Sequence, residues 1–156
     1  MDGRLLEGIV LSGFLCAAAV VDFRSGFIYD RLTAPMAALA CGFRLYDGAG
    51  FVPLLLGLLA GGGPLLAIRM LSRGGLGGGD VKLAAAGGLW LGWQGALLAL
   101  ALAAWSGGLA AIFLLASGKK RRRDSVAFGP FLAFGIGAAF FFGERLLAMY
   151  GEYCRG

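Results

Sequence analysis

The sequence predicts an all-α protein that crosses a membrane several times. Of its 156 residues, 59% are hydrophobic and only 15% are charged, and the mean hydropathy is +0.81. Soluble domains carry about 25% charged residues, so this chain lacks the polar side chains needed to cover a soluble core. We therefore expect a single polytopic membrane domain over residues 1–156.

Apolar runs separated by short polar or glycine-rich stretches predict about six transmembrane helices, because roughly 20 helical residues cross a bilayer core. The expected spans are 5–21, 31–46, 51–71, 80–92, 93–116 and 126–150. A tight turn is expected at LGWQG, residues 91–95, between the fourth and fifth spans. The second and fourth spans are short, and each has an aspartate at or just before one end.

Lysine and arginine predict the orientation, because they favour cytoplasmic loops. With both termini outside, the inner loops and helix ends carry ten of the fourteen basic residues. We therefore expect an N-out, C-out protein of the cytoplasmic membrane. The basic run Lys119–Arg123 is then expected to contact anionic lipid rather than nucleic acid. This orientation places four aspartates together on the cytoplasmic side: Asp22, Asp30, Asp80 and Asp124.

The absence of histidine and of paired cysteines limits the kinds of catalytic and metal site that this sequence can form. The chain has no histidine, and its three cysteines show no paired spacing. Zinc sites, imidazole bases and Ser-His triads depend largely on these residues. We therefore expect no metal and no cofactor.

Asp22 ends the first predicted span, and Asp80 opens the fourth behind the glycine-rich stretch GGLGGG. Asp80 could simply cap the start of its helix, and Asp22 could pair with Arg24 or Arg31 at the interface. Ionisable residues at membrane depth are costly, however, and usually face the bundle interior. Two carboxylates close together there cannot easily both ionise and would share a proton. Such a pair can activate water against an amide carbonyl and protonate the leaving amine.

The glycines before Asp80 suit that chemistry, because glycine allows a neighbouring backbone to come close. Gly77 and Gly79 could therefore help to receive an extended peptide. The alternatives are a merely flexible loop or close helix packing.

Three stretches together resemble the type IV prepilin peptidases, a family of GxGD intramembrane aspartic proteases. The first is DFRSGFIYDRLT, with Asp22, Ile28, Asp30, Leu32 and Thr33 at motif positions. The second is GxGDxKL, with Gly77, Gly79, Asp80, Lys82 and Leu83. The third is FGPFLA, which begins with Phe128, Gly129 and Pro130. The resemblance covers nearly the whole chain.

The resemblance implies a membrane aspartic endopeptidase of type IV pilus and secretion systems. It would remove the basic leader of prepilins or pseudopilins at the cytoplasmic face, cutting after glycine and before an apolar helix. Asp22 and Asp80 would be the catalytic pair. Lys82 matches a lysine of the family motif. The residues alone assign it no catalytic role, and its side chain could simply extend to the membrane interface. Asp30 is expected to cap the second helix, and Asp30 or Asp124 could recognise the basic leader.

Two departures from the family pattern stand out. Tyr29 occupies a position where the family usually has proline. The paired CxxC motifs that precede the first span of the bifunctional members are absent here. The chain therefore resembles the short, peptidase-only form, and we expect neither methyltransfer nor an S-adenosylmethionine site.

Other functions remain open on the residues alone. A presenilin-like protease shares GxGD, but no PAL-type motif occurs in the last span. A small proton-coupled transporter or channel could use Asp22 and Asp80 as relay groups. A scaffold would use both aspartates structurally.

Overall fold

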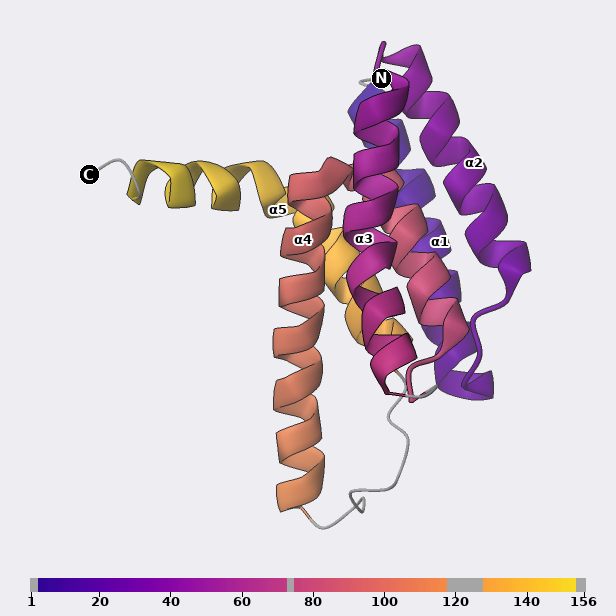
Figure 1. The fold of residues 1–156 in the computed structure, drawn as a ribbon, viewed down its shortest axis with the longest axis vertical. Coiled ribbons are helices and arrows are strands. Elements are labelled where there is room, and N and C mark those ends of the chain that lie inside the picture. Colours follow the sequence, from indigo (N-terminus) through magenta and orange to yellow (C-terminus); the bar gives the residue numbers. More distant parts are fainter. Residues whose placement is uncertain (1–2, 73–74, 118–127, 154–156) are drawn as a thin grey trace.

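The computed structural model describes residues 3–72, 75–117 and 128–153, and this part of the chain consists of helices joined by short connections, without strands (Figure 1). The helices are α1 (Gly3–Ser25), α2 (Asp30–Tyr46), α3 (Phe51–Leu71), α4 (Gly78–Ala116) and α5 (Gly129–Tyr153). The all-α prediction is confirmed.

Helix α4 consists of two helical limbs joined at Gly92, the residue at which LGWQG predicts a turn. Gly92 has φ 71° and ψ 177°, a combination that is open essentially to glycine alone. Figure 1 shows the limb before Gly92 and the limb after it running in opposite directions. The fourth and fifth predicted spans therefore correspond to the two limbs of α4.

Four helices are long and apolar enough to cross a membrane by length and composition: α1, α3, α4 and α5. Large apolar side chains such as Ile9, Phe23 and Ile112 are exposed on the outside of the bundle, as expected for a surface in contact with lipid. The chain is a multi-pass membrane protein. Six separate spans and the N-out, C-out orientation stay predictions.

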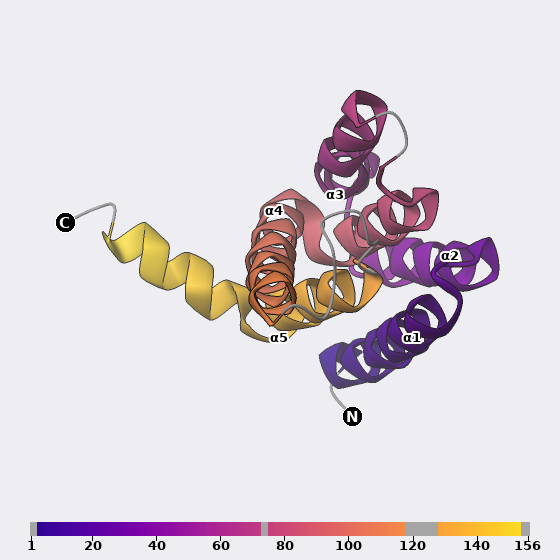
Figure 2. The same cartoon turned by 90° about the horizontal axis from the view of Figure 1, so that it is seen from below.

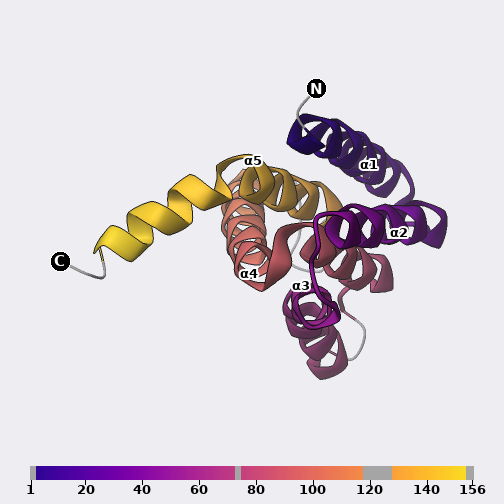
Figure 3. The same cartoon turned by 90° about the horizontal axis from the view of Figure 1, so that it is seen from above.

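The first limb of α4 is the centre of the packing. Helix α4 contacts α2, α3 and α5, while α1 packs mainly on α5. Seen along the bundle, α1 and α3 lie on opposite sides of this first limb (Figures 2 and 3). Gly57 and Gly61 of α3 meet Gly88 of α4 backbone to backbone, the close approach that small residues permit between membrane helices.

The bundle has two distinct ends. The end of α1 and the starts of α2, the first limb of α4 and α5 lie together; we call this the aspartate end (Figure 1). The opposite end, which we call the far end, holds the start of α1, the end of α2 and the turn at Gly92. The sequence prediction that Asp22, Asp30 and Asp80 share one end agrees with this arrangement.

Candidate active site

Asp22 lies in the last turn of α1, which ends because Gly26 adopts φ +68°. The Gly26 amide donates to the Asp22 carbonyl at 2.8 Å, which closes the helix in the way common for C-terminal glycines. The Asp22 side chain is only 5% exposed. This termination leaves the carboxylate buried at the aspartate end.

The start of α5 provides the hydrogen-bond partner of Asp22. The Gly129 amide donates to Asp22 Oδ2 at 2.9 Å, and the first amides of a helix are free and carry partial positive charge. A Cβ on Gly129 would lie 2.5 Å from Asp22 Oδ2 and 2.7 Å from its carboxyl carbon. Only glycine fits between the α5 backbone and this carboxylate.

Asp80 lies in the first turn of α4 and is 8% exposed. A Cβ on Gly77 would lie 3.0 Å from Asp80 Oδ2, so one carboxylate oxygen lies against the backbone of the glycine-rich stretch. Asp80 Oδ1 is buried and has no hydrogen-bond partner in the described part of the chain. Asp22 and Asp80 lie close enough for their charges to interact. The fold therefore brings together two carboxylates that are 58 positions apart in the sequence.

Gly79 holds the connection between α1 and α2 against the start of α4. A Cβ on Gly79 would lie 2.7 Å from Ile28 Cβ and 2.8 Å from the Ile28 carbonyl oxygen. Ile28 and Thr33 are both buried, at 8% and 5% exposure. The second glycine of GxGD is therefore required by the close approach of another backbone.

Asp30 and Lys82 form an ion pair. Lys82 Nζ donates to Asp30 Oδ1 and Oδ2 at 2.6 and 2.7 Å, and both side chains are more than half exposed. The N-cap of α2 is Tyr29, without a side-chain cap hydrogen bond, so the expected capping by Asp30 is wrong. The spacing of Asp30 and Lys82 in the sequence gives no indication that they meet.

The remaining residues expected at the site lie in or near the start of α5. The Phe128 carbonyl accepts the amides of Phe131 and Leu132 at 3.1 and 3.0 Å, and Pro130 lies in the first turn, where its lack of an amide costs little. Asp124 and the run Lys119–Arg123 lie outside the described residues, so their expected roles stay predictions.

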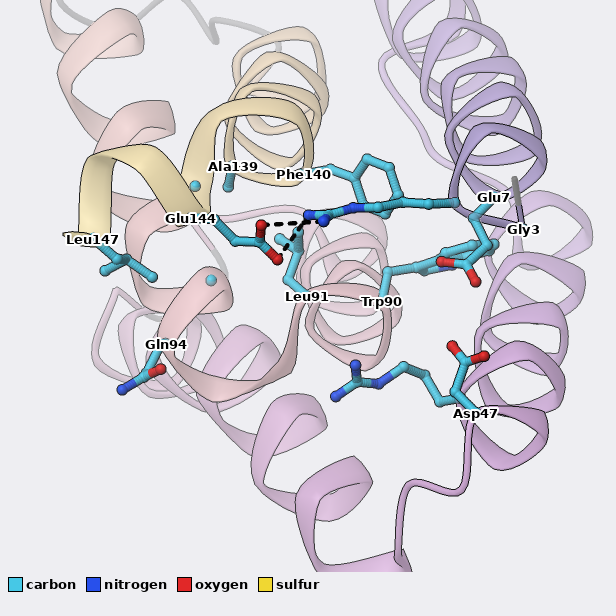
Figure 4. Close-up of a pocket in the computed structure, with 14 residues that line it drawn as sticks. Gly3, Glu7, Asp47, Trp90, Leu91, Gln94, Ala139, Phe140, Glu144 and Leu147 are labelled. Atoms are coloured by element: carbon cyan, nitrogen blue, oxygen red, sulfur yellow. Dashed lines mark hydrogen bonds and ion pairs between the residues drawn. The ribbon is translucent and has the colours of Figure 1, made fainter. Parts of the chain in front are cut away.

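A hollow of about 520 Å³ lies at the far end rather than beside the aspartates (Figure 4). Arg4 and Glu144 form an ion pair in its wall at 2.8 Å. Glu7 and Asp47 also line it, with Arg44 close by. No three His, Cys, Asp or Glu residues of the described ranges cluster in a way that could hold a metal ion.

The structure is a helical membrane bundle with two buried carboxylates, Asp22 and Asp80, at one end and a GxGD sequence at the second of them. The model of the type IV leader peptidase family matches residues 9–117. The chain belongs to this family. The resemblance stated from the motifs is confirmed.

Curated relatives agree with the family. The prepilin leader peptidase/N-methyltransferase of Burkholderia pseudomallei (strain 1026b) is 33% identical over 96% of this chain and 50% of its own length. Proteins of the same name from Xanthomonas campestris pv. campestris and Escherichia coli (strain K12) are each 35% identical, over 91% and 78% of this chain and 52% and 56% of their own lengths. The chain therefore spans about half the length of these relatives. No solved structure matches the chain.

Proposed function

We propose that this protein is an aspartic endopeptidase that removes the leader of prepilin or pseudopilin substrates. The observation that carries the proposal is the pair of buried carboxylates, Asp22 and Asp80, which interact with each other and have no cationic partner in the described part of the chain. Buried acids without a counter-charge are costly, and such groups concentrate at functional sites. The names of the relatives support the substrate class.

Asp22 fits the role of general base. Its Oδ2 accepts the Gly129 amide at the start of α5, and hydrogen bonds to a carboxylate favour its charged form. Asp80 fits the role of general acid, because its Oδ1 is buried without a partner and the proton shared by the pair can reside there.

The reaction then proceeds in two proton transfers. Asp22 takes a proton from water as the water oxygen bonds to the carbonyl carbon of the scissile peptide. Asp80 gives its proton to the leaving nitrogen as the carbon–nitrogen bond breaks. The products are a carboxylic acid and an amine, and one later proton transfer from Asp22 to Asp80 restores the starting state.

The site is proposed to face the cytoplasm at the cytoplasmic membrane, with the apolar helix of the substrate in the lipid and cleavage directly after a glycine.

Because the carboxylate of Asp30 is already paired with Lys82, Asp124 is the acid we propose for contact with the basic leader. Charge reversal at Asp124 should then raise KM. An unchanged KM would remove Asp124 from leader recognition. Nothing in the described site favours a transporter or a presenilin-like reaction over leader cleavage.

The test is cleavage of a co-expressed prepilin-like substrate, followed by gel shift and mass spectrometry. We expect the wild type to cut after glycine, and Asp22→Asn and Asp80→Asn each to reduce the rate by roughly a thousandfold or more. Asp47→Asn at the far end is the matched control and should retain activity. If one of the two active-site variants cuts normally while folded, the carboxylate pair is not the catalyst.

A further inference from the structure

The Lys82–Asp30 ion pair lies next to the candidate active site without belonging to it. Lys82 lies two residues after Asp80 on α4. Asp30 lies eight residues after Asp22, as the first residue of α2. Residues two apart on a helix point to different sides. Lys82 therefore points away from the carboxylate pair and towards the start of α2, where it meets Asp30 at 2.6 Å.

The connection between α1 and α2 is short, so the position of Asp30 constrains the position of Asp22. The helices are separated only by residues 26–29, and one of these, Ile28, lies against Gly79. Gly79, which contacts Ile28, directly precedes Asp80, and Lys82, which pairs with Asp30, follows Asp80 by two residues. The start of α4 therefore contacts residues 28–30 both immediately before and shortly after Asp80.

Helix α2 is held against α4 by buried side chains and by polar contacts. Its buried residues are Thr33, Met36 and Ala40, and it packs on α4 much more than on α1. One polar contact further along α2 is the bond from Trp90 Nε1 to the Met36 carbonyl at 3.1 Å. At the first turn of α2, the polar contact to α4 is the pair of hydrogen bonds from Lys82 Nζ to the Asp30 carboxylate.

We propose that Lys82 and Asp30 are positioning residues, which hold the α1–α2 connection on the first turn of α4 and thereby set the separation of Asp22 and Asp80. This inference rests on the proposed peptidase function. It replaces leader recognition as the role of Asp30, because that carboxylate already accepts two hydrogen bonds from Lys82. It also replaces snorkelling as the role of Lys82.

The chemistry predicts an effect on rate rather than on stability. Ion pairs with exposed side chains contribute little to the free energy of unfolding, and both partners here are more than half exposed. Catalysis depends far more steeply on geometry, because displacement of a reacting group by about 1 Å can cost roughly a hundredfold. Loss of either partner should therefore lower kcat and leave KM and the thermal unfolding midpoint nearly unchanged.

The kinetic test compares Lys82→Gln, Asp30→Asn and the exchanged double variant Asp30→Lys/Lys82→Asp with the wild type. Arg31→Gln removes a neighbouring exposed charge and is the matched control. We expect each single variant to lose roughly ten- to a hundredfold in kcat, the double variant to recover most of it, and Arg31→Gln to keep wild-type kinetics. A rise in KM for Asp30→Asn alone would show leader recognition, and unchanged kcat in both single variants would show no positioning role. Either result overturns the proposal.

A second measurement needs no cleavage, so it separates this proposal from the function on which it rests. Amide hydrogen exchange over residues 26–33 should become several times faster in Lys82→Gln and return towards the wild-type rate in the double variant. If exchange there is unchanged by Lys82→Gln, the positioning role is wrong whatever the kinetics show. If the wild type cuts no substrate while exchange behaves as expected, the proposed function fails and the positioning contact stands.

Discussion

The two ends of the bundle differ in how deeply their acidic side chains are buried and in which charged groups lie beside them. At the far end, Glu144 is 2.8 Å from Arg4, and Glu7 and Asp47 project into a hollow shared with Arg44 (Figure 4). At the aspartate end, Asp22 and Asp80 are 5% and 8% exposed and have no ion-pair partner in the described ranges.

The difference separates structural acids from candidate catalytic ones. An exposed acid beside an arginine or lysine is neutralised at little cost, and Asp30 belongs to this group although it lies at the aspartate end. A buried acid next to a second acid is unfavourable for folding, and such groups concentrate at functional sites. Burial together with the missing counter-charge distinguishes Asp22 and Asp80 from the other described acids.

The largest effect that would sharpen the comparison is expected at Gly129, at the aspartate end. In Gly129→Ala the new methyl group would lie 2.5 Å from Asp22 Oδ2, so the carboxylate must move and lose its amide partner. We expect roughly a hundredfold loss of kcat for leader cleavage, with the protein still folded. Gly137→Ala is the control in the same helix, because its Cβ meets nothing closer than 3.6 Å. Equal activities of the two variants would show that the Gly129 contact does not matter.

A smaller effect, on stability, is expected at the far end. Gly92→Ala places a side chain at φ 71° and ψ 177°, which costs about 1–3 kcal/mol of the free energy of unfolding. Unfolding in detergent should show the loss. Gly108→Ala, where a Cβ meets nothing within 4 Å, should be neutral or slightly stabilising because alanine favours helices. A Gly92→Ala protein as stable as wild type would contradict a sharp turn between the limbs of α4.

The smallest effect is expected from Glu144→Gln, which breaks the Arg4–Glu144 pair. Both side chains are more than half exposed, so the loss of unfolding free energy should stay below about 1 kcal/mol, and leader cleavage should remain within twofold of wild type. Cleavage rate and thermal midpoint are measured on the same preparation. A large loss of cleavage would show that the far end takes part in the reaction and would break the distinction between the two ends.

Much of the fold could be read from the sequence, since long apolar runs interrupted by glycine and charge define helices and their ends. The break at Gly92 was expected from LGWQG. The proximity of Asp22 and Asp80 was expected because both lie at helix ends that the charge pattern places on the same side of the membrane. The contact of Asp30 with Lys82 was not predicted, because it depends on how α2 lies across α4. The hollow at the far end was also missed, since its charged residues are distributed over α1, the end of α2 and the residue after it, and α5.

The sequence by itself determined the membrane class, the helical segments and the GxGD family, because composition, periodicity and short motifs are local properties. Only the tertiary structure decided which groups surround each acid. It placed the Gly129 amide on Asp22, left Asp80 Oδ1 without a described partner, and paired Asp30 with Lys82. The physical reason is that hydrogen bonds and ion pairs between distant segments depend on how helices are rotated and packed, and a linear pattern does not specify either.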